Sequence, residues 1–182
     1  MSVQILIENA LYHASQLFLL PVLLLVIALA IYSFYALGVF TRQAMQRRGG
    51  DARGFDLLAT WRNDHALSPT ALETIAFKRL EGARLATRIA PMLGLVATMI
   101  PMGPALKSLA DGKLEAVSAN LTVAFSAVIL ALIAASITYF TVNVRRRWYA
   151  EELMMIEKER LAPANQTEMA QAAHGLAQEA AE

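Results

Sequence analysis

Hydrophobic residues gather into three long runs along the chain, and polar residues fill the stretches between them. The runs cover residues 17–40, 89–110 and 117–144, and Lys107 is the one charged residue within them. At the helical rise of about 1.5 Å per residue, each run forms a helix of about 30 Å or more, which matches the hydrocarbon core of a bilayer. The pattern predicts an all-α membrane protein with three transmembrane helices and long cytoplasmic helical extensions.

The polar stretches also show helical periodicity. In residues 1–16, apolar positions recur every three or four residues, which predicts an amphipathic helix at the membrane interface. Residues 41–88 predict a cytoplasmic helical region. Within it, Ser68 and Pro69 are the residue types that favour a helix start, as N-cap and first-turn residue. No helix breaker follows before Pro91, so we expect the second span to continue this helix.

A similar extension follows the third span. A polar turn, residues 111–116, joins the second and third spans. Residues 145–162 should extend the third span as an amphipathic cytoplasmic helix that stops before Pro163. Residues 163–182 are rich in Ala, Gln and Glu, and we expect a flexible tail there.

Basic residues decide the expected orientation. Arg and Lys outnumber Asp and Glu in residues 41–88, and Arg145, Arg146 and Arg147 follow the third span, whereas the turn 111–116 is nearly neutral. Cytoplasmic flanks of membrane spans are enriched in Lys and Arg. We therefore expect the N-terminus and the turn outside, and the C-terminus in the cytoplasm.

The second span is unusually rich in proline, with Pro91, Pro101 and Pro104 inside it. Membrane helices tolerate proline where neighbouring helices satisfy the freed backbone groups. On an ideal helix, Pro91, Gly94, Thr98 and Pro101 fall on one face. This face is expected to lie against other helices.

The third span has two adjacent faces of small residues. One carries the hydroxyls of Ser118, Thr122 and Ser126, and the other carries alanines from Ala124 to Ala134. Small residues let membrane helices approach closely, and hydroxyls can bond the backbone of their own helix. The residues alone leave two interpretations open, namely helix packing and a narrow, partly polar conduit.

Composition excludes several classes of protein. The chain is 57% hydrophobic, above the content of a usual soluble domain, and it has no cysteine. Its histidines, His13, His65 and His174, are far apart, and no nucleophile–base pair or phosphate loop accompanies them. We expect no enzymatic activity, no metal and no cofactor. The basic residues are attributed to the membrane flanks rather than to nucleic-acid binding.

Ionisable groups are missing from the interior of all three spans. A proton or ion relay through a membrane usually needs such a group. The chain is therefore not expected to carry protons alone, unless a partner supplies a carboxylate.

The span sequences resemble a known family. Residues 90–98, Ala-Pro-Met-Leu-Gly-Leu-Val-Ala-Thr, resemble the second-span signature of the MotA/TolQ/ExbB proton channel family, roughly A-P-x-L-G-L-x-G-T. Residues 121–127 are similar to that family's third-span motif of hydroxyl and alanine, and the short outer turn is closer to compact ExbB/TolQ-like members than to flagellar stators. The sequence departs from the family at Ala97, usually Gly, at Ser126, usually Thr, and at Ala135, near a frequent Pro.

The resemblance implies a homo-pentameric ring around two copies of a single-span partner similar to ExbD, TolR or MotB. The partner's transmembrane Asp would bind protons. The hydroxyls of Thr98 and Ser126 would line the proton pathway, with Thr122 as the rival to Ser126. The residues that would shape the pore wall are Pro91, Gly94 and Pro101.

These inferences together predict the pore-ring subunit of a motor in the cell inner membrane, driven by the proton-motive force. It would conduct protons rather than sodium and would couple ion transport to work such as protein transport. The alternative is a non-conducting membrane scaffold that assembles a complex through its cytoplasmic helices. Half of a secondary transporter is disfavoured, because the chain has no internal repeat and no charged intramembrane site.

Overall fold

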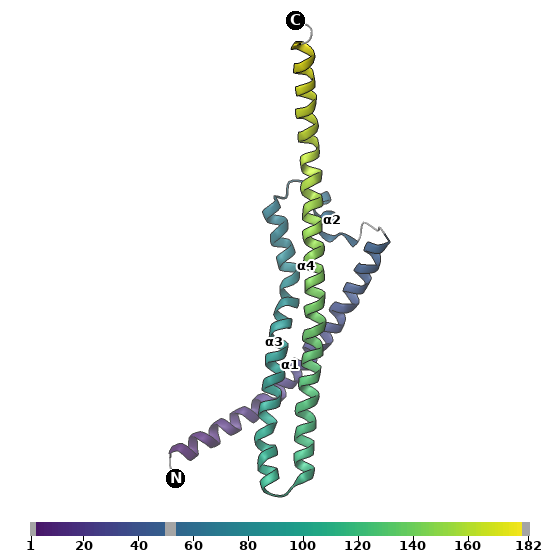
Figure 1. Ribbon diagram of the computed structural model, residues 1–182. Helices are drawn as coiled ribbons and strands as arrows, with labels where there is room; N and C mark the ends of the chain where they lie inside the picture. Colours follow the sequence, from purple (N-terminus) through teal and green to yellow (C-terminus); the bar gives the residue numbers. More distant parts are fainter. Residues whose placement is uncertain (1–2, 50–53, 180–182) are drawn as a thin grey trace. The chain divides into compact units, whose positions relative to one another are not determined.

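The computed structural model describes residues 3–49 and 54–179, and every regular element in them is helical. Figure 1 shows the four helices in chain order, with α3 and α4 antiparallel and joined by a tight turn. Three helices are long and apolar enough to cross a membrane, over Ala10–Arg48, Pro69–Ala110 and Leu114–Ala162. The predicted all-α class with three candidate spans is therefore confirmed.

The first span lies within a single helix, α1 (Val3–Arg48). The sequence suggested an interfacial helix over 1–16 and a separate span over 17–40, but no break separates them in the described part of the chain. Pro21 lies inside α1 without ending it. The uncharged run is long enough to keep the helix continuous, and the interfacial location of its first turns stays a prediction.

Three helices contribute to residues 41–88, which were expected to be helical, and the first of them is the end of α1. The short helix α2 covers Asp56–Asn63, and α3 covers Pro69–Ala110. Ser68 caps α3, because its Oγ accepts a hydrogen bond from the Ala71 amide at 3.2 Å. The predicted start at Ser68 and Pro69, and the continuation of this helix into the second span, are both confirmed.

The turn between the second and third spans is a Schellman motif. Gly112 has a φ of 72°, a left-handed conformation that favours glycine. The Lys113 amide donates to Ser108 O at 2.9 Å, and the Gly112 amide donates to Leu109 O at 3.1 Å. Carbonyls left unpaired at the end of α3 are thereby satisfied, so the next helix can begin at Leu114.

The last helix, α4, covers Leu114–Glu179. The sequence placed its end before Pro163, and this boundary is wrong. The Ala- and Gln-rich residues beyond that proline have high helix propensity, which outweighs the loss of one backbone hydrogen bond. Residues 180–182 of the expected tail lie outside the described residues, and its flexibility stays a prediction.

The chain divides into two compact units, and α1, α3 and α4 contribute to both. The membrane unit is Met1–Thr41 with Glu81–Asn143, and the polar unit is Arg42–Leu80 with Val144–Glu182. Small buried clusters hold the membrane unit together: Ala30 with Ala90, Ala134 and Ala135, and Val22 with Ala97 and Ala127.

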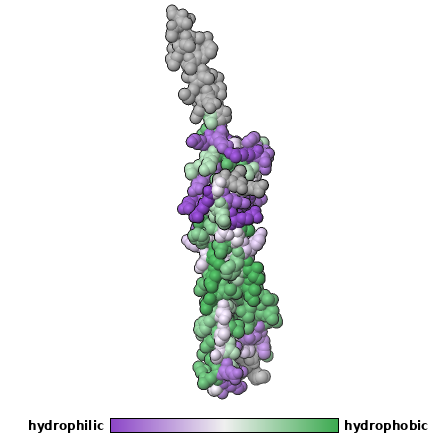
Figure 2. Space-filling view, turned by 90° about the vertical axis from the view of Figure 1, so that its right-hand side faces the viewer, coloured by the Kyte–Doolittle hydropathy of each residue, from purple (hydrophilic) through white to green (hydrophobic). Residues whose placement is uncertain are grey.

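The surface of the membrane unit is mostly hydrophobic. Figure 2 shows hydrophobic side chains gathered over the part of the chain that holds the spans. Large side chains such as Leu95 and Phe125 are more than half exposed, at 63% and 59%. Such exposure is normal in lipid or against other membrane helices. Large apolar side chains therefore cover the outer faces of this unit in the single chain.

The polar unit has a hydrophobic core of its own. Tyr149 and Ile156 of α4 pack against α2 and the first turns of α3. Tyr149 is only 3% exposed within this core. The cluster contains Leu57, Leu58, Trp61, Leu72, Ala76, Leu80, Tyr149 and Ile156.

Candidate functional site: the hairpin of α3 and α4

The two helices of the hairpin meet along a seam of small side chains in the membrane unit. The seam residues recur every three or four positions, which keeps one face of each helix against the other. Alanine side chains let the two backbones approach closely. The buried seam residues are Ala83, Ala86, Ala90, Gly94, Ala97, Pro101 and Ala105 on α3, and Ala124, Ala127, Ala131, Ala134 and Thr138 on α4.

Gly94 marks a close approach of the two helices along this seam. A Cβ atom at Gly94 would lie 2.9 Å from Ala131 Cβ and 3.4 Å from Val128 Cγ2. Carbon atoms pack at about 3.5–4.0 Å, so no side chain fits there without separating the helices. Gly94 therefore sets the separation of α3 and α4 at this point, and its role in shaping a pore wall stays a prediction.

A hydrogen bond between hydroxyls lies within the seam. Thr87 Oγ1 donates to Thr138 Oγ1 at 3.0 Å, and Thr138 Oγ1 lies 2.9 Å from the Ala134 carbonyl oxygen. Thr138 continues the alanine face of the third span one turn beyond Ala134, whereas Thr87 precedes the predicted span and was missed. Thr87 lies seven residues, or two helical turns, before Gly94, and this spacing could have placed it on the same face of the helix.

The facing pairs fix the register of the hairpin. Thr87 faces Thr138, Gly94 faces Ala131, and Ala97 packs with Ala127. Because the helices are antiparallel, residue numbers rise along α3 as they fall along α4. One residue beyond the pair of Ala97 and Ala127, Thr98 therefore lies level with Ser126. Thr122 lies about one helical turn, roughly 6 Å, nearer the turn between the spans. The register favours Ser126 over Thr122 as the hydroxyl at the depth of Thr98.

Thr98 lies at the edge of the seam. Its side chain is partly exposed, and its Oγ1 donates to the Leu95 carbonyl at 2.7 Å. Pro91 is also partly exposed, whereas Gly94 and Pro101 are buried against the hairpin partner. The face predicted for these four residues is therefore split into buried members and edge members.

The third-span hydroxyls point away from the seam. Ser126 and Thr122 are exposed in the protomer, and Thr122 Oγ1 donates to the Ser118 carbonyl at 2.8 Å. At 3.6 residues per turn, Ser126 is rotated by about 100° from Ala127 and by about 160° from Ala124. Within the single chain, the proline face of the second span does not lie opposite these hydroxyls. Alanines lie opposite it, since they allow the closer packing.

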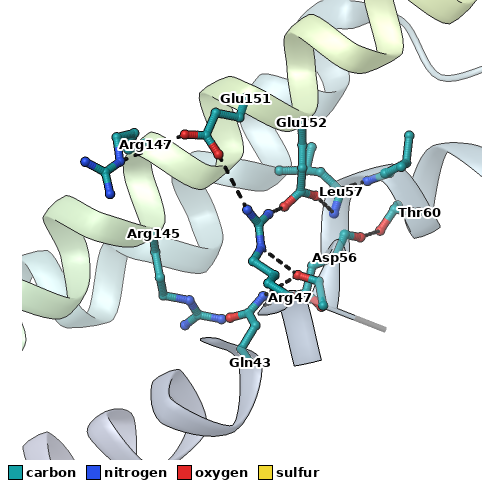
Figure 3. Close-up of polar contacts among 11 residues, drawn as sticks. Gln43, Arg47, Asp56, Leu57, Thr60, Arg145, Arg147, Glu151 and Glu152 are labelled. Atoms are coloured by element: carbon teal, nitrogen blue, oxygen red, sulfur yellow. Dashed lines mark hydrogen bonds and ion pairs between the residues drawn. The ribbon is translucent and has the colours of Figure 1, made fainter. Parts of the chain in front are cut away.

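A second cluster of functional interest lies in the polar unit around Arg47 and Glu152. Figure 3 shows the Arg47 guanidinium between Glu151 and Glu152 of α4. Arg47 pairs with Glu152, lies 3.8 Å from Glu151, and donates from Nε to the Gly54 carbonyl at 2.8 Å. Its guanidinium also lies 4.6 Å from the ring centroids of Phe55 and Trp148.

Glu152 also caps α2 from a distant part of the sequence. Its Oε2 accepts hydrogen bonds from the amides of Leu57, at 2.7 Å, and Leu58, at 3.2 Å (Figure 3). These are first-turn amides, and the local N-cap residue Phe55 provides no side-chain hydrogen bond. One fully buried carboxylate therefore satisfies a helix start and pairs with a cation.

Asp56 extends the same network on the other side. Its Oδ2 accepts from Gln43 Nε2 at 3.0 Å and lies 3.7 Å from Arg145 Nη2 (Figure 3). The network joins the end of α1, the start of α2 and α4 within the polar unit. It was missed from sequence, where Arg47 and Arg145 counted only toward orientation.

Comparison with protein families identifies the hairpin. The model of the MotA/TolQ/ExbB proton channel family matches residues 67–158, about half of the chain. The chain belongs to the MotA/TolQ/ExbB proton channel family. Membership implies a proton channel role in energy-transducing membrane complexes, and the family is not an enzyme family. No curated protein and no solved structure matched the chain.

Proposed function

We propose that this protein is the pore-ring subunit of a motor in the inner membrane, driven by the proton-motive force. In this proposal, copies of the chain surround a single-span partner whose intramembrane Asp binds and releases protons. The number of copies is five and that of the partner two, as the family resemblance implies. Family membership supports the channel role, and the charge-free interiors of the spans make a partner's carboxylate necessary.

The observation that carries the proposal is the direction of the hydroxyls. The hairpin closes on alanine, whereas Ser126 and Thr122 are exposed and Thr98 lies at the seam edge. Thr98 and Ser126 share a depth but lie on different sides of the protomer. They can approach each other only across a boundary between neighbouring copies, which is the arrangement that a ring provides.

These hydroxyls suit a proton pathway. Each has one donor and two acceptor positions, so it can bond an ionised carboxylate, a protonated one or a water molecule. In the protomer, Thr98 and Thr122 donate to carbonyls of their own helices, which leaves their acceptor positions available. The hydroxyls would therefore stabilise both protonation states of the partner's Asp.

The test is proton flux in vesicles that contain the chain and its single-span partner, driven by a pH gradient and followed with an internal pH-sensitive dye. Thr98→Val combined with Ser126→Ala is expected to reduce flux at least tenfold. Ser136→Ala is the matched control, because Ser136 is exposed on the same helix and donates only to the Leu132 carbonyl, at 2.8 Å. Unchanged flux in the double variant contradicts the site assignment.

Further measurements test the channel role, the rival hydroxyl and the number of copies in turn. A wild-type complex that assembles but conducts no protons would support a non-conducting scaffold. Thr122→Val tests the rival hydroxyl, and we expect less effect than from Ser126→Ala because Thr122 lies about one turn from the depth of Thr98. The mass of the purified complex gives the number of copies directly, and a mass incompatible with five contradicts the ring.

Orientation has a simple test, because the chain contains no cysteine. Lys113→Cys introduces one cysteine in the turn between the spans, and Glu157→Cys introduces one in the polar extension of α4. A membrane-impermeant thiol reagent added outside intact cells should label only the first variant. Labelling of only the second variant would contradict the proposed topology and indicate the opposite orientation.

A further inference from the structure

A cleft lies between α1 and α3 in the membrane unit. Its volume is about 260 Å³, and apolar side chains and the Tyr32 ring form most of its wall. The lining residues are Leu29, Tyr32, Gly82, Leu85, Ala86 and Ile89. This is a groove suited to a hydrocarbon chain.

A second cavity, three of whose four lining residues are charged, adjoins the cleft and shares Leu85 with it. It has a volume of about 200 Å³ and is lined by Glu81, Arg84, Leu85 and Arg88. Glu81, Arg84 and Arg88 are exposed, and within residues 3–49 and 54–179 no hydrogen bond or ion pair engages them. The apolar cleft therefore adjoins charges that have no partner among the described residues.

The order of these charges follows depth in the membrane. Spacings of three and four residues place Glu81, Arg84 and Arg88 on one face of α3. Arg88 immediately precedes the apolar run 89–110, and Glu81 lies about 10 Å farther from the bilayer along the helix axis. With the run 89–110 in the bilayer, the two cations would lie at the level of lipid phosphates, and the anion would lie beyond them at the level of the terminal group of a headgroup.

Tyr32 adds a hydroxyl at the junction. A Cβ atom at Gly82 would lie 3.1 Å from Tyr32 Oη, so this oxygen rests against the bare backbone of Gly82. No described residue bonds this hydroxyl. An interfacial tyrosine has an apolar ring and a polar tip, which can donate to a phosphate or ester oxygen.

We propose that this site binds a glycerophospholipid whose headgroup carries a primary ammonium, such as phosphatidylethanolamine. Arg84 and Arg88 bind the phosphate, Glu81 accepts hydrogen bonds from the ammonium, and an acyl chain lies in the apolar cleft. Charge complementarity supports this occupant, because the order of anion and cations on α3 matches the order of ammonium and phosphate in the lipid. The inference requires insertion of the spans in a membrane and does not depend on proton conduction.

The experiment is native mass spectrometry of the full chain, in the complex it forms in neutral detergent, titrated with single lipids. The probes are phosphatidylethanolamine, phosphatidylcholine and phosphatidylglycerol with identical acyl chains, and inorganic phosphate. We expect phosphatidylethanolamine to bind two- to fivefold more tightly than phosphatidylcholine, which offers no N–H donor. Inorganic phosphate should not compete, because it has no acyl chain.

Three variants separate the parts of the site. Arg84→Gln with Arg88→Gln should weaken the binding of phosphatidylethanolamine about thirtyfold, at about 1 kcal/mol per arginine. Glu81→Gln should remove the preference over phosphatidylcholine. Leu85→Trp should fill the cleft and weaken the binding of every phospholipid. These side chains are exposed, so the variants are expected to fold.

The matched control is Arg42→Gln with Arg48→Gln. Both arginines are exposed on α1, beyond the first span. Their substitution removes the same amount of charge as the double variant on α3, but from a different helix. An equal loss of binding in this control would mean unspecific attraction to a basic flank and would overturn the proposal. Tighter binding of phosphatidylglycerol than of phosphatidylethanolamine, or full competition by inorganic phosphate, would overturn it as well.

Discussion

Substitution of Gly94 is the sharpest test of the hairpin geometry. In Gly94→Ala, the new Cβ atom meets Ala131 Cβ at 2.9 Å, and neither atom can rotate away. Normal contact at about 3.5–4.0 Å requires the helices to separate by about 0.6–1.1 Å. Overpacking of this kind costs about 1–3 kcal/mol.

Helix propensity acts in the opposite direction and has to be removed from the comparison. Alanine is favoured over glycine in a helix by about 1 kcal/mol, which hides part of the clash. Gly103→Ala is the matched control, because it lies on the same helix and its Cβ would meet nothing within 4 Å. The difference between the two variants therefore isolates the contact with Ala131.

The assay is thermal unfolding of the purified chain in one detergent. At about 2–4 °C per kcal/mol for a chain of this size, Gly94→Ala should unfold about 2–12 °C below Gly103→Ala. Ala131→Gly in the Gly94→Ala background removes the opposing atom and should restore most of the difference. Equal midpoints for the two alanine variants, or no restoration, would refute the close approach.

Three further predictions concern polar and backbone features. Glu152→Ala leaves a buried cation and two helix-start amides without their partner and should lower the free energy of unfolding by about 3–5 kcal/mol. The control Glu151→Ala removes a half-exposed carboxylate and should cost less than about 1 kcal/mol. Denaturant unfolding compares the two variants, and equal losses contradict the cap. Thr138→Val removes one interhelical hydrogen bond and should cost about 0.6 kcal/mol by the same assay, so a loss above about 2 kcal/mol refutes this small value. Gly112→Ala imposes a left-handed φ on a residue with a Cβ and should cost about 1–2 kcal/mol, whereas an unchanged melting midpoint argues against the Schellman turn.

The helices were predictable because their signals are local. A membrane span requires a long uncharged run, and residues 17–40, 89–110 and 117–144 each provide one. Ser68 is a helix cap through an amide three residues away, so its role is readable from a tetrapeptide. The end of α4 was misplaced because proline alone was weighted above the helix-forming residues after it.

The partners across the fold were not predictable because periodicity assigns faces and not contacts. Glu152 reaches the Leu57 amide across 95 residues of sequence, and no spacing rule links them. On α4, sequence identified both the hydroxyl face and the alanine face, but it could not decide which one meets α3. The register of Thr87 with Thr138 settled the depth of Ser126 only once the two helices were placed together.

The alanine seam has a consequence for the order of assembly. Burying a leucine or methionine freezes rotamers, whereas burying alanine freezes none. Closing α3 against α4 therefore loses little side-chain entropy, and the hairpin can form as soon as both spans are inserted. The long side chains on its outer faces, such as Leu95 and Phe125, keep their rotameric freedom at that stage. In the proposed ring, their ordering would wait for neighbouring copies, so this part of the entropic cost would fall on assembly of the ring rather than on folding of the single chain.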